Sequence, residues 1–255
     1  MQVKHLGSGI VLIENLLSQD ELSLIDFTKI KSQCTPQGYK KINGEDVMEV
    51  GGYVIPQKDL ATMPIRYKQG IEDLSFYQII DDAVYRGSVE YCTLFPVSLE
   101  SITNYVGKSF VMYPPGASMG PHSDSSLAYK SGTIEPISTI ALGNTVTASI
   151  VLNDQFEGGS VNFRTWDIEV FPKPGSALFY PSNYIGAHEV SEVTSGVRWI
   201  FFATLTHGDI SFVTQNPEAE KYIDRYEWTT KLRQDIRKNL NTKQENLNNF
   251  QKKVS

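Results

Sequence analysis

Short hydrophobic runs, rich in Val, Ile, Phe and Tyr, follow one another through the chain after Leu99. Turn residues separate these runs, as at Pro114-Pro-Gly116 and Pro172-Lys-Pro-Gly175. Many short strands with such punctuation are typical of a β-sandwich, a jelly roll or a barrel. The pattern therefore predicts a mostly β fold with flanking helices. The predicted strands span residues 109–113, 145–152, 160–163, 168–171, 176–180, 188–193 and 197–205.

The first hundred residues mix strand and helix patterns. A short apolar run at 9–14 predicts a strand, and another strand is expected at 47–55. Ser18 and Glu21 have the spacing of a capping box, in which each side chain accepts a hydrogen bond from the other residue's backbone. The apolar spacing that follows predicts a helix of about a dozen residues. A second helical pattern covers residues 74–94.

The end of the chain returns to a helical pattern. Its apolar residues form one stripe, while the charged residues lie elsewhere around the helix. We expect this helix to pack on the β core and to be followed by a disordered tail after about residue 242. The chain thus divides into a β domain with N-terminal helices, residues 1–210, and a helical extension with a basic tail, residues 211–255. The stripe consists of Tyr222, Tyr226, Leu232, Ile236 and Leu240.

Charge is distributed unevenly along the chain. The net charge is −6, but residues 221–255 carry nine Lys and Arg against four Asp and Glu. The first 220 residues therefore carry 14 basic and 25 acidic side chains. An acidic body argues against nucleic acid as the main partner, because phosphate backbones require a basic surface. The basic tail leaves a weak form of that alternative open.

Neither a secretion signal nor a membrane span is predicted. The most apolar stretch near the N-terminus, residues 9–17, is interrupted by Glu14 and falls short of the roughly 18 apolar residues of a spanning helix. Two cysteines, Cys34 and Cys92, make no disulfide framework and are expected to be inert thiols. The sequence therefore predicts a soluble, cytoplasmic protein.

Two of the four histidines lie in surroundings that suggest metal binding. His122 and Asp124 are two residues apart on a predicted strand, where side chains at this spacing point to the same face. Both could meet one metal ion, although a surface turn would give the same short motif. His5 and His207 are expected to be surface or loop residues with no ligand role.

A second element adds a histidine and a cation. The stretch from His188 to Arg198 is interpreted as a strand, a tight turn at Ser195-Gly196 and a returning strand. On that returning strand Arg198 shares a face with Ile200 and Phe202, so its charge points into apolar surroundings. A buried guanidinium needs an anionic partner, and its planar fork suits a bound carboxylate.

Two histidines and one carboxylate on one side of a metal are typical of non-heme Fe(II) oxygenases. A Zn hydrolase is the chemical competitor, because Zn accepts the same three ligands and a water. An arginine ten residues after the last ligand, however, has no required role in such a hydrolase. His122, Asp124, His188 and Arg198 are therefore the candidate catalytic residues.

The order of these motifs resembles the prolyl 4-hydroxylase-like branch of the 2-oxoglutarate/Fe(II) oxygenases. The ten-residue spacing from the second histidine to the arginine matches that family, as does a tyrosine, Tyr113, nine residues before the first histidine. The likeness extends over residues 9–205. The stretches that carry it are Tyr113-Pro-Pro-Gly116, His122-Ser-Asp124, Val151 to Gly159, Phe171-Pro-Lys-Pro-Gly175, Leu178-Phe-Tyr-Pro181 and His188 to Arg198.

The resemblance implies a double-stranded β-helix, the jelly-roll or cupin-like fold, with Fe(II) held by His122, Asp124 and His188. It also implies that 2-oxoglutarate is the co-substrate, with its far carboxylate bound by Arg198 and Tyr113. Molecular oxygen would be consumed, succinate and CO2 released, and ascorbate could serve as reductant. Asp124 favours hydroxylation, because halogenating relatives have Ala or Gly at this position.

Several questions stay open on sequence alone. The substrate could be a prolyl or other peptidyl residue, a free amino acid or another small metabolite, and the oligomeric state is unknown. A non-catalytic or Zn-occupied β-helix that serves as a binding module is the alternative function. The loop at residues 125–144 is longer than most in compact domains, so it is either a substrate lid or a plain surface excursion.

Overall fold

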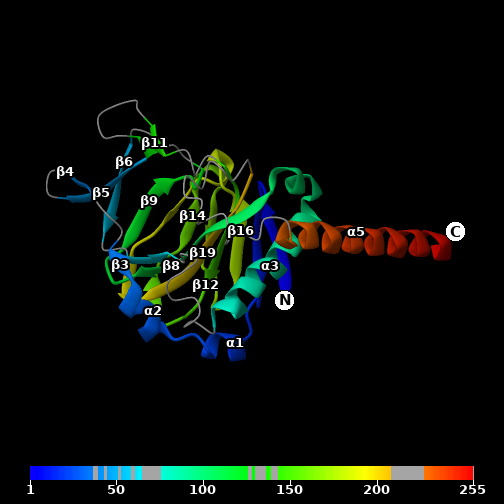
Figure 1. The fold of residues 1–255 in the computed structure, drawn as a ribbon, viewed down its shortest axis with the longest axis horizontal. Helices are drawn as coiled ribbons and strands as arrows, with labels where there is room; N and C mark the ends of the chain where they lie inside the picture. The colour runs from blue at the N-terminus through cyan, green and yellow to red at the C-terminus, as the bar shows by residue number, and fades with distance from the viewer. Residues whose placement is uncertain are drawn as a thin grey trace.

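A computed structural model describes residues 1–36, 40–42, 45–50, 53–58, 61–64, 76–125, 128–129, 136–138, 143–207 and 227–254 of the chain. Two antiparallel sheets form the body, one with eight strands and one with seven (Figure 1). Two apolar clusters made of side chains from both sheets lie between them. The arrangement is the double-stranded β-helix that the sequence predicted.

The larger sheet has the strand order β1-β2-β16-β12-β19-β8-β7-β3, and the smaller sheet has the order β15-β14-β17-β9-β6-β5-β4. The strands of the larger sheet, in that order, are Gln2–Gly7, Ile10–Glu14, Ala177–Pro181, Asn144–Val151, Arg198–Thr206, Asn104–Tyr113, Ala61–Pro64 and Thr35–Pro36. Those of the smaller sheet are Ile168–Val170, Val161–Phe163, His188–Val190, Ser118–His122, Tyr53–Lys58, Glu45–Val50 and Lys40–Ile42. Two short pairs complete the strands: β10 (Ala128–Tyr129) with β11 (Pro136–Ser138), and β13 (Phe156–Gly158) with β18 (Val193–Gly196).

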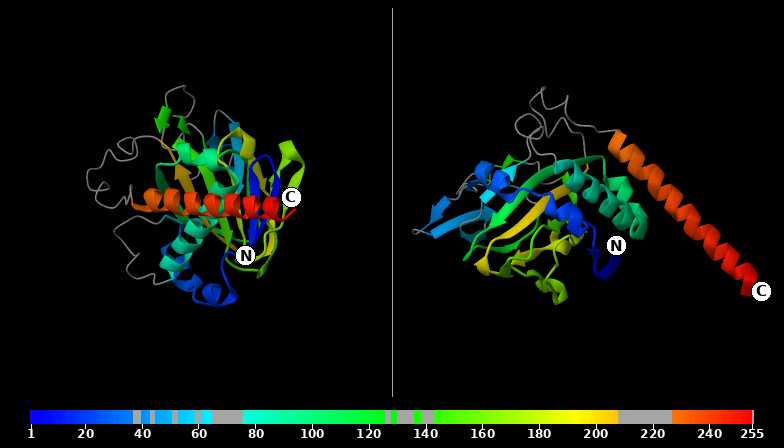
Figure 2. Two further views of the ribbon diagram at one scale, coloured as in Figure 1. Left: turned by 90° about the vertical axis from the view of Figure 1, so that its right-hand side faces the viewer. Right: turned by 90° about the horizontal axis from the view of Figure 1, so that it is seen from below.

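Helices cover the outer face of the larger sheet (Figures 1 and 2). Side chains alternate between the two faces of each strand, so one face of the larger sheet presents apolar side chains to the helices. Ile150, Phe201 and Phe110 lie in register on this face. The residue that follows on one strand, Val151, faces the sheet-to-sheet interior instead. The helical segments are α1 (Gln19–Ser23), α2 (Phe27–Gln33), α3 (Tyr77–Leu94), η1 (Pro96–Ser101), η3 (Arg164–Trp166), η4 (Tyr184–Gly186) and α5 (Glu227–Val254).

Helix α5 packs on α3 through its first turns and then extends away from the body (Figure 2). Leu232 and Ile236 are fully buried in the core that α3 shares. Tyr85 donates a hydrogen bond of 2.7 Å to Asp235, and Arg233 donates to the Leu99 carbonyl at 2.8 Å. The predicted packing is confirmed. The division at residue 210 stays a prediction, since residues 208–226 lie outside the described part.

The predicted strands after Leu99 and the helix near 74–94 are confirmed to within a few residues. Three other predictions were wrong. The N-terminal helix is two helices, because Asp26 caps a new one by accepting from the Lys29 backbone N–H at 2.9 Å. The strand expected at 47–55 is two paired strands, β5 and β6. The last helix continues to Val254, where a disordered tail was expected.

The predicted hairpin from His188 to the returning strand was also wrong. Strand β17 lies in the smaller sheet beside β9 and β14, whereas β19 lies in the larger sheet between β12 and β8. Between them β18 pairs with β13 instead of with β19. The chain therefore crosses from one sheet to the other, which places His188 and Arg198 on opposite walls of the interior.

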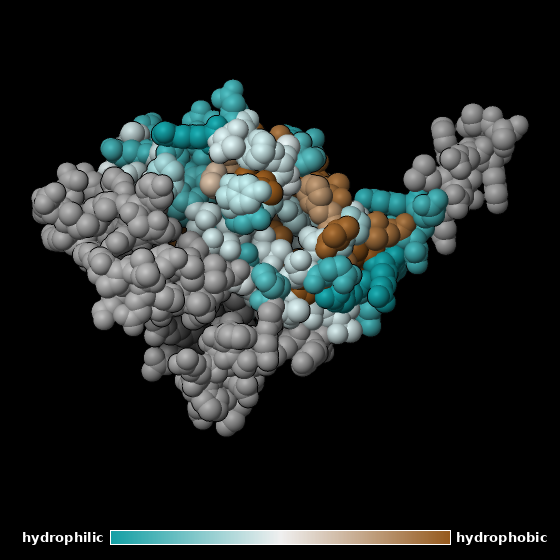
Figure 3. Space-filling view, turned by 90° about the horizontal axis from the view of Figure 1, so that it is seen from above, coloured by the Kyte–Doolittle hydropathy of each residue, from teal (hydrophilic) through white to brown (hydrophobic). Residues whose placement is uncertain are grey.

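Surface and cysteine chemistry give little further information. Hydrophobic side chains form small patches among hydrophilic ones on the face seen from above (Figure 3). Cys34 and Cys92 are free thiols, and Cys92 is buried in the core under the helices. No helix within the described ranges combines the length and the apolar character needed to cross a membrane.

A candidate metal centre between the sheets

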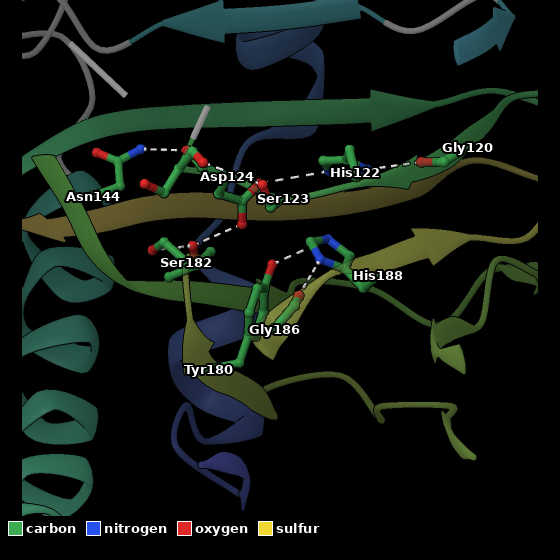
Figure 4. A network of polar contacts seen from close by, with 11 residues as sticks. Gly120, His122, Ser123, Asp124, Asn144, Tyr180, Ser182, Gly186 and His188 are labelled. Carbon is green, nitrogen blue, oxygen red and sulfur yellow. Dashed lines mark hydrogen bonds and ion pairs between the residues drawn. The ribbon is translucent and has the colours of Figure 1, made fainter. Parts of the chain in front are cut away.

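Pairing of β9 with β17 brings two histidines together. His122 and His188 lie opposite each other across the two strands, with ring centroids 4.4 Å apart. Asp124 completes the cluster, with Oδ1 3.5 Å from His122 Nε2 (Figure 4). One potential ligand atom from each residue lies within 4.8 Å of the other two. Among the described residues this is the only group of this kind.

Asp124 reaches the cluster by a different route from the one predicted. Strand β9 ends at His122, and Asp124 lies in the bend beyond it, so strand alternation does not align the two. Strand β12 positions it instead: Asn144 Nδ2 donates to its backbone carbonyl at 2.8 Å, and Thr147 Oγ1 donates to Oδ2 at 2.7 Å. Because Thr147 gives its one proton to Asp124, the Ser182 hydroxyl 2.9 Å away must donate to Thr147.

Backbone carbonyls orient both imidazole rings. Nδ1 of His122 lies 2.8 Å from the Gly120 carbonyl oxygen, and Nδ1 of His188 lies 3.0 Å from that of Gly186 (Figure 4). A carbonyl can only accept, so each Nδ1 carries a proton and each Nε2 faces the cluster. A carbonyl partner on the far nitrogen is the usual outer contact of a metal-bound histidine.

Burial and charge separate the acid–base properties of the three groups. Burial and the neighbouring His122 lower the pKa of His188 to about 4, so its Nε2 lone pair is free at neutral pH. Burial alone would lower the pKa of His122, but the hydrogen bond and charge of Asp124 raise it above its ordinary value. Burial opposes ionisation of Asp124, yet the two histidines and Thr147 lower its pKa to about 2. The donor set thus contains one carboxylate and one free imidazole nitrogen, and His122 binds a metal once it loses a proton.

Arg198 enters the same interior from the larger sheet. Only 1% of its surface is exposed, and it lies opposite Tyr113 across β19 and β8. The guanidinium carbon is 5.1 Å from the centroid of the Tyr113 ring. Neither Nε nor Nη1 has a hydrogen-bond partner within the described part of the chain. A buried cation with two unsatisfied N–H groups indicates an anionic ligand that binds there.

Gly159 makes room for this arginine. A Cβ atom at this position would lie 2.8 Å from Cδ of Arg198 and 3.1 Å from a methyl group of Val193. The residue also has a φ of +65°, which L side chains rarely adopt. Gly159, which ends one of the stretches that resemble the oxygenase family, therefore fits the backbone around the Arg198 side chain.

Two residues at the cluster were missed as site residues. Thr147 received no role, and Tyr180 was noted only as part of a family motif. The Tyr180 hydroxyl lies 3.3 Å from Nε2 of His188, and 2% of the residue is exposed. Thr147 and Tyr180 stand opposite each other across β12 and β16. On β16 Tyr180 is the one side chain with a polar group, which was an available signal, whereas β12 carries several polar side chains and did not single out Thr147.

The remaining histidines lie elsewhere. His5 is exposed on β1, with its ring 5.3 Å from that of Phe95. His207 is exposed after β19, with Nδ1 3.2 Å from the Thr145 hydroxyl. Much of the 125–144 loop lies outside the described residues, which include the β10–β11 pair and the two ends of the loop. The lid hypothesis therefore stays a prediction.

Comparisons with known proteins support the architecture. The family model of the 2OG-Fe(II) oxygenase superfamily matches residues 109–204, a span that contains all the predicted site residues. No curated protein matches the chain.

Solved structures share the fold at low identity. The chain is similar to a viral collagen prolyl hydroxylase from Paramecium Bursaria Chlorella virus-1 in complex with 2OG, with 16% identity, 78% of this chain and 97% of that chain covered, and a TM-score of 0.50. A Pseudomonas putida prolyl-4-hydroxylase has 18% identity to this chain, with 79% of this chain and 94% of that chain covered and a TM-score of 0.45. The match of residues 109–204 thus supports a 2-oxoglutarate-dependent dioxygenase, as the motifs predicted, and the similarity to the Chlorella virus structure supports the fold.

Proposed function

We propose that the protein hydroxylates a C–H bond of a small molecule or peptide, with Fe(II) bound by His122, Asp124 and His188. In this proposal 2-oxoglutarate binds beside the metal, and its far carboxylate is held by Arg198 and Tyr113. The products are the hydroxylated substrate, succinate and CO2. Ascorbate is proposed as the reductant that keeps the metal ferrous.

The buried guanidinium of Arg198, two of whose nitrogens lack partners within the described ranges, carries the proposal. Burying a charge without a partner costs several kcal/mol, which is roughly half of a typical domain's net stability. Binding of a carboxylate to such a buried arginine offsets this free-energy cost. A guanidinium has two edges with parallel N–H donors, Nε with Nη2 and Nη1 with Nη2, and each edge suits a carboxylate better than a single oxygen ligand. In the described part of the chain one nitrogen of each edge, Nε and Nη1, lacks a partner.

The three proposed metal ligands leave room for further ligands. Two imidazoles and one carboxylate on one side of a metal leave positions opposite, which is the arrangement of Fe(II) oxygenases. When bound, the iron would supply oxygen activation coupled to decarboxylation of the 2-oxo acid. The residues of the chain would bind the iron and the co-substrate, and their neighbours orient the metal ligands. Thr147 fixes the Asp124 carboxylate, while Gly120 and Gly186 fix the imidazoles.

The surroundings also restrict access of water to this chemistry. One apolar cluster lies beside Arg198 and includes Val111, Val151 and Ile200. A second lies beside His188 and includes Phe163, whose ring centroid is 5.6 Å from that of the histidine. A water-poor site strengthens the charge interactions of Arg198 with a bound carboxylate.

Substrate identity is proposed only as a class. Candidates are a prolyl or other peptidyl residue, a free amino acid or another small metabolite. The Chlorella virus protein with the same fold is named as a collagen prolyl hydroxylase, so peptidyl proline is the first candidate to test. Asp124 supports hydroxylation, because a carboxylate at this position occupies the place that a halide would need.

The test measures succinate release by the purified protein with Fe(II), ascorbate, 2-oxoglutarate and a panel of candidate substrates. The variants His122→Ala, Asp124→Ala and His188→Ala should each abolish release while circular dichroism shows a folded protein. His207→Ala, which removes an exposed histidine away from the cluster, should retain it. Near wild-type release by any of the three variants would show that the ligand assignment is wrong. Tight Zn binding without release by the wild type would favour the binding module.

A further inference from the structure

Tyr180 is held rigidly at the edge of the proposed metal site. Its ring packs edge-on against Phe163, with centroids 5.2 Å apart, and against His188, with centroids 4.8 Å apart. Gly186 closes the other side, since a Cβ there would lie 3.0 Å from Cδ2 of the tyrosine. The hydroxyl is therefore fixed in position, 3.3 Å from Nε2 of His188 (Figure 4).

Metal binding would remove the partner that this hydroxyl has. Nδ1 of His188 donates to the Gly186 carbonyl, so Nε2 has a lone pair that accepts from Tyr180. The same lone pair would bind the metal, which leaves the phenol as a buried donor without its acceptor. An unsatisfied buried hydroxyl is costly, so the loaded site must offer Tyr180 another acceptor.

The groups around the Tyr180 phenol indicate which acceptor its hydroxyl would have in the metal-bound site. Asp124, Tyr113 and Arg198 are all near enough for their charges to act on Tyr180, and Asp124 is also near enough to accept a hydrogen bond from it. A ligand that extends from the metal to Arg198 therefore passes the hydroxyl. Asp124 is a weaker candidate, since its Oδ2 already accepts from Thr147 and its carboxylate is a proposed metal ligand.

We infer that Tyr180 donates a hydrogen bond to the metal-bound end of the 2-oxo acid co-substrate. The inference rests on the proposed function, but it adds a second protein contact to that ligand. Arg198 holds the far carboxylate, and Tyr180 holds the end that binds the metal. Phenylalanine would provide the same packing, so only the hydroxyl distinguishes this role from a structural one.

The experiment compares wild type, Tyr180→Phe and Tyr91→Phe as full-length proteins. Tyr91 is the matched control, because it is also buried and donates to the Gly9 carbonyl at 3.1 Å on the helix side of the larger sheet. Each protein is loaded with Fe(II) without oxygen and titrated with 2-oxoglutarate, while the charge-transfer absorption band of the complex is recorded. The Fe(II) affinity of each is measured separately.

Tyr180→Phe should weaken 2-oxoglutarate binding roughly tenfold or more, the effect of losing one hydrogen bond to a charged acceptor. Its band at saturation should also shift, because the lost bond acts on the end of the ligand that meets the metal. Fe(II) affinity should match the wild type, and Tyr91→Phe should match it in every respect.

Three results separate the explanations. Wild-type affinity and an unshifted band in Tyr180→Phe would overturn the role of Tyr180 while leaving the proposed function intact. Weaker Fe(II) binding with unchanged 2-oxoglutarate affinity would overturn it too, since Tyr180 would then act on the metal or Asp124. Absence of the band in the wild type would instead contradict the proposed function.

Discussion

Replacing Arg198 with alanine should remove most of the affinity for 2-oxoglutarate and leave the metal site intact. In the described part of the chain Nε and Nη1 are buried without partners, so the variant loses the roughly two charge-assisted hydrogen bonds of a guanidinium–carboxylate pair. At about 1.5 kcal/mol or more for each, the loss is about 3 kcal/mol, which weakens binding roughly a hundredfold. Arg198→Lys should fall between, because lysine keeps the charge and loses the planar fork.

Stability gives this prediction a second, independent readout. Within the described ranges Nε and Nη1 of this buried guanidinium have no partner, so removal of the charge from protein without 2-oxoglutarate relieves a cost. Arg198→Met, which keeps much of the side-chain volume, should therefore unfold at the same or a higher urea concentration than the wild type. A residue that merely held the fold together would give the opposite result.

The assay is the anaerobic 2-oxoglutarate titration of the Fe(II) protein, followed by urea unfolding of the metal-free protein. Fe(II) affinity serves as the internal control, since Arg198 is not a proposed metal ligand. Unchanged 2-oxoglutarate affinity in Arg198→Ala would refute the co-substrate assignment. A large loss of stability in Arg198→Met would refute the argument that the charge lacks a partner in the free protein.

Three further predictions follow from contacts around the site. Gly159→Ala should weaken 2-oxoglutarate binding and lower the melting temperature by a few degrees, because its Cβ would meet Cδ of Arg198 at 2.8 Å and a φ of +65° costs about 1–2 kcal/mol. Equal melting temperatures would contradict this reading. Thr147→Val should weaken Fe(II) binding about ten- to a hundredfold by freeing the Asp124 carboxylate, as metal titration can show. Fe(II) affinity should fall as pH drops below the raised pKa of His122, since this imidazole must lose its proton to bind, while Asp124, with a pKa of about 2, stays ionised. Calorimetry in several buffers should therefore detect proton release on binding, and pH-independent affinity between pH 8 and 6 would count against it.

Local pattern predicted much of the fold, because a strand's sequence reflects what lies on its two faces. Strand β19 was predicted almost to the residue, and Arg198 was correctly expected to point into apolar surroundings. The strand that carries His188 was assigned the wrong partner, because pairing depends on residues far away in sequence. A β-helix passes the chain from sheet to sheet, and Ser195-Gly196, which was predicted to be a turn, belongs to strand β18 paired with β13.

Some residues of the candidate site could likewise be predicted from the sequence, and others could not. His122, Asp124, His188 and Arg198 could be proposed from spacing and chemistry within two short segments. Tyr180 and Thr147 lie on strands that meet these segments only in the folded protein, so their contacts with the cluster were not visible in the sequence. The geometry of Asp124 was likewise hidden, because a bend fixed by β12 sets its position.

The most direct test of the central claim is a crystal structure of the protein grown without oxygen in the presence of Fe(II) and 2-oxoglutarate. Anomalous scattering measured at the iron absorption edge locates the metal without assumptions about its ligands. The account predicts one strong peak between His122, Asp124 and His188, with the far carboxylate of 2-oxoglutarate on the guanidinium of Arg198. Iron at any other position, or 2-oxoglutarate bound without contact to Arg198, would contradict it.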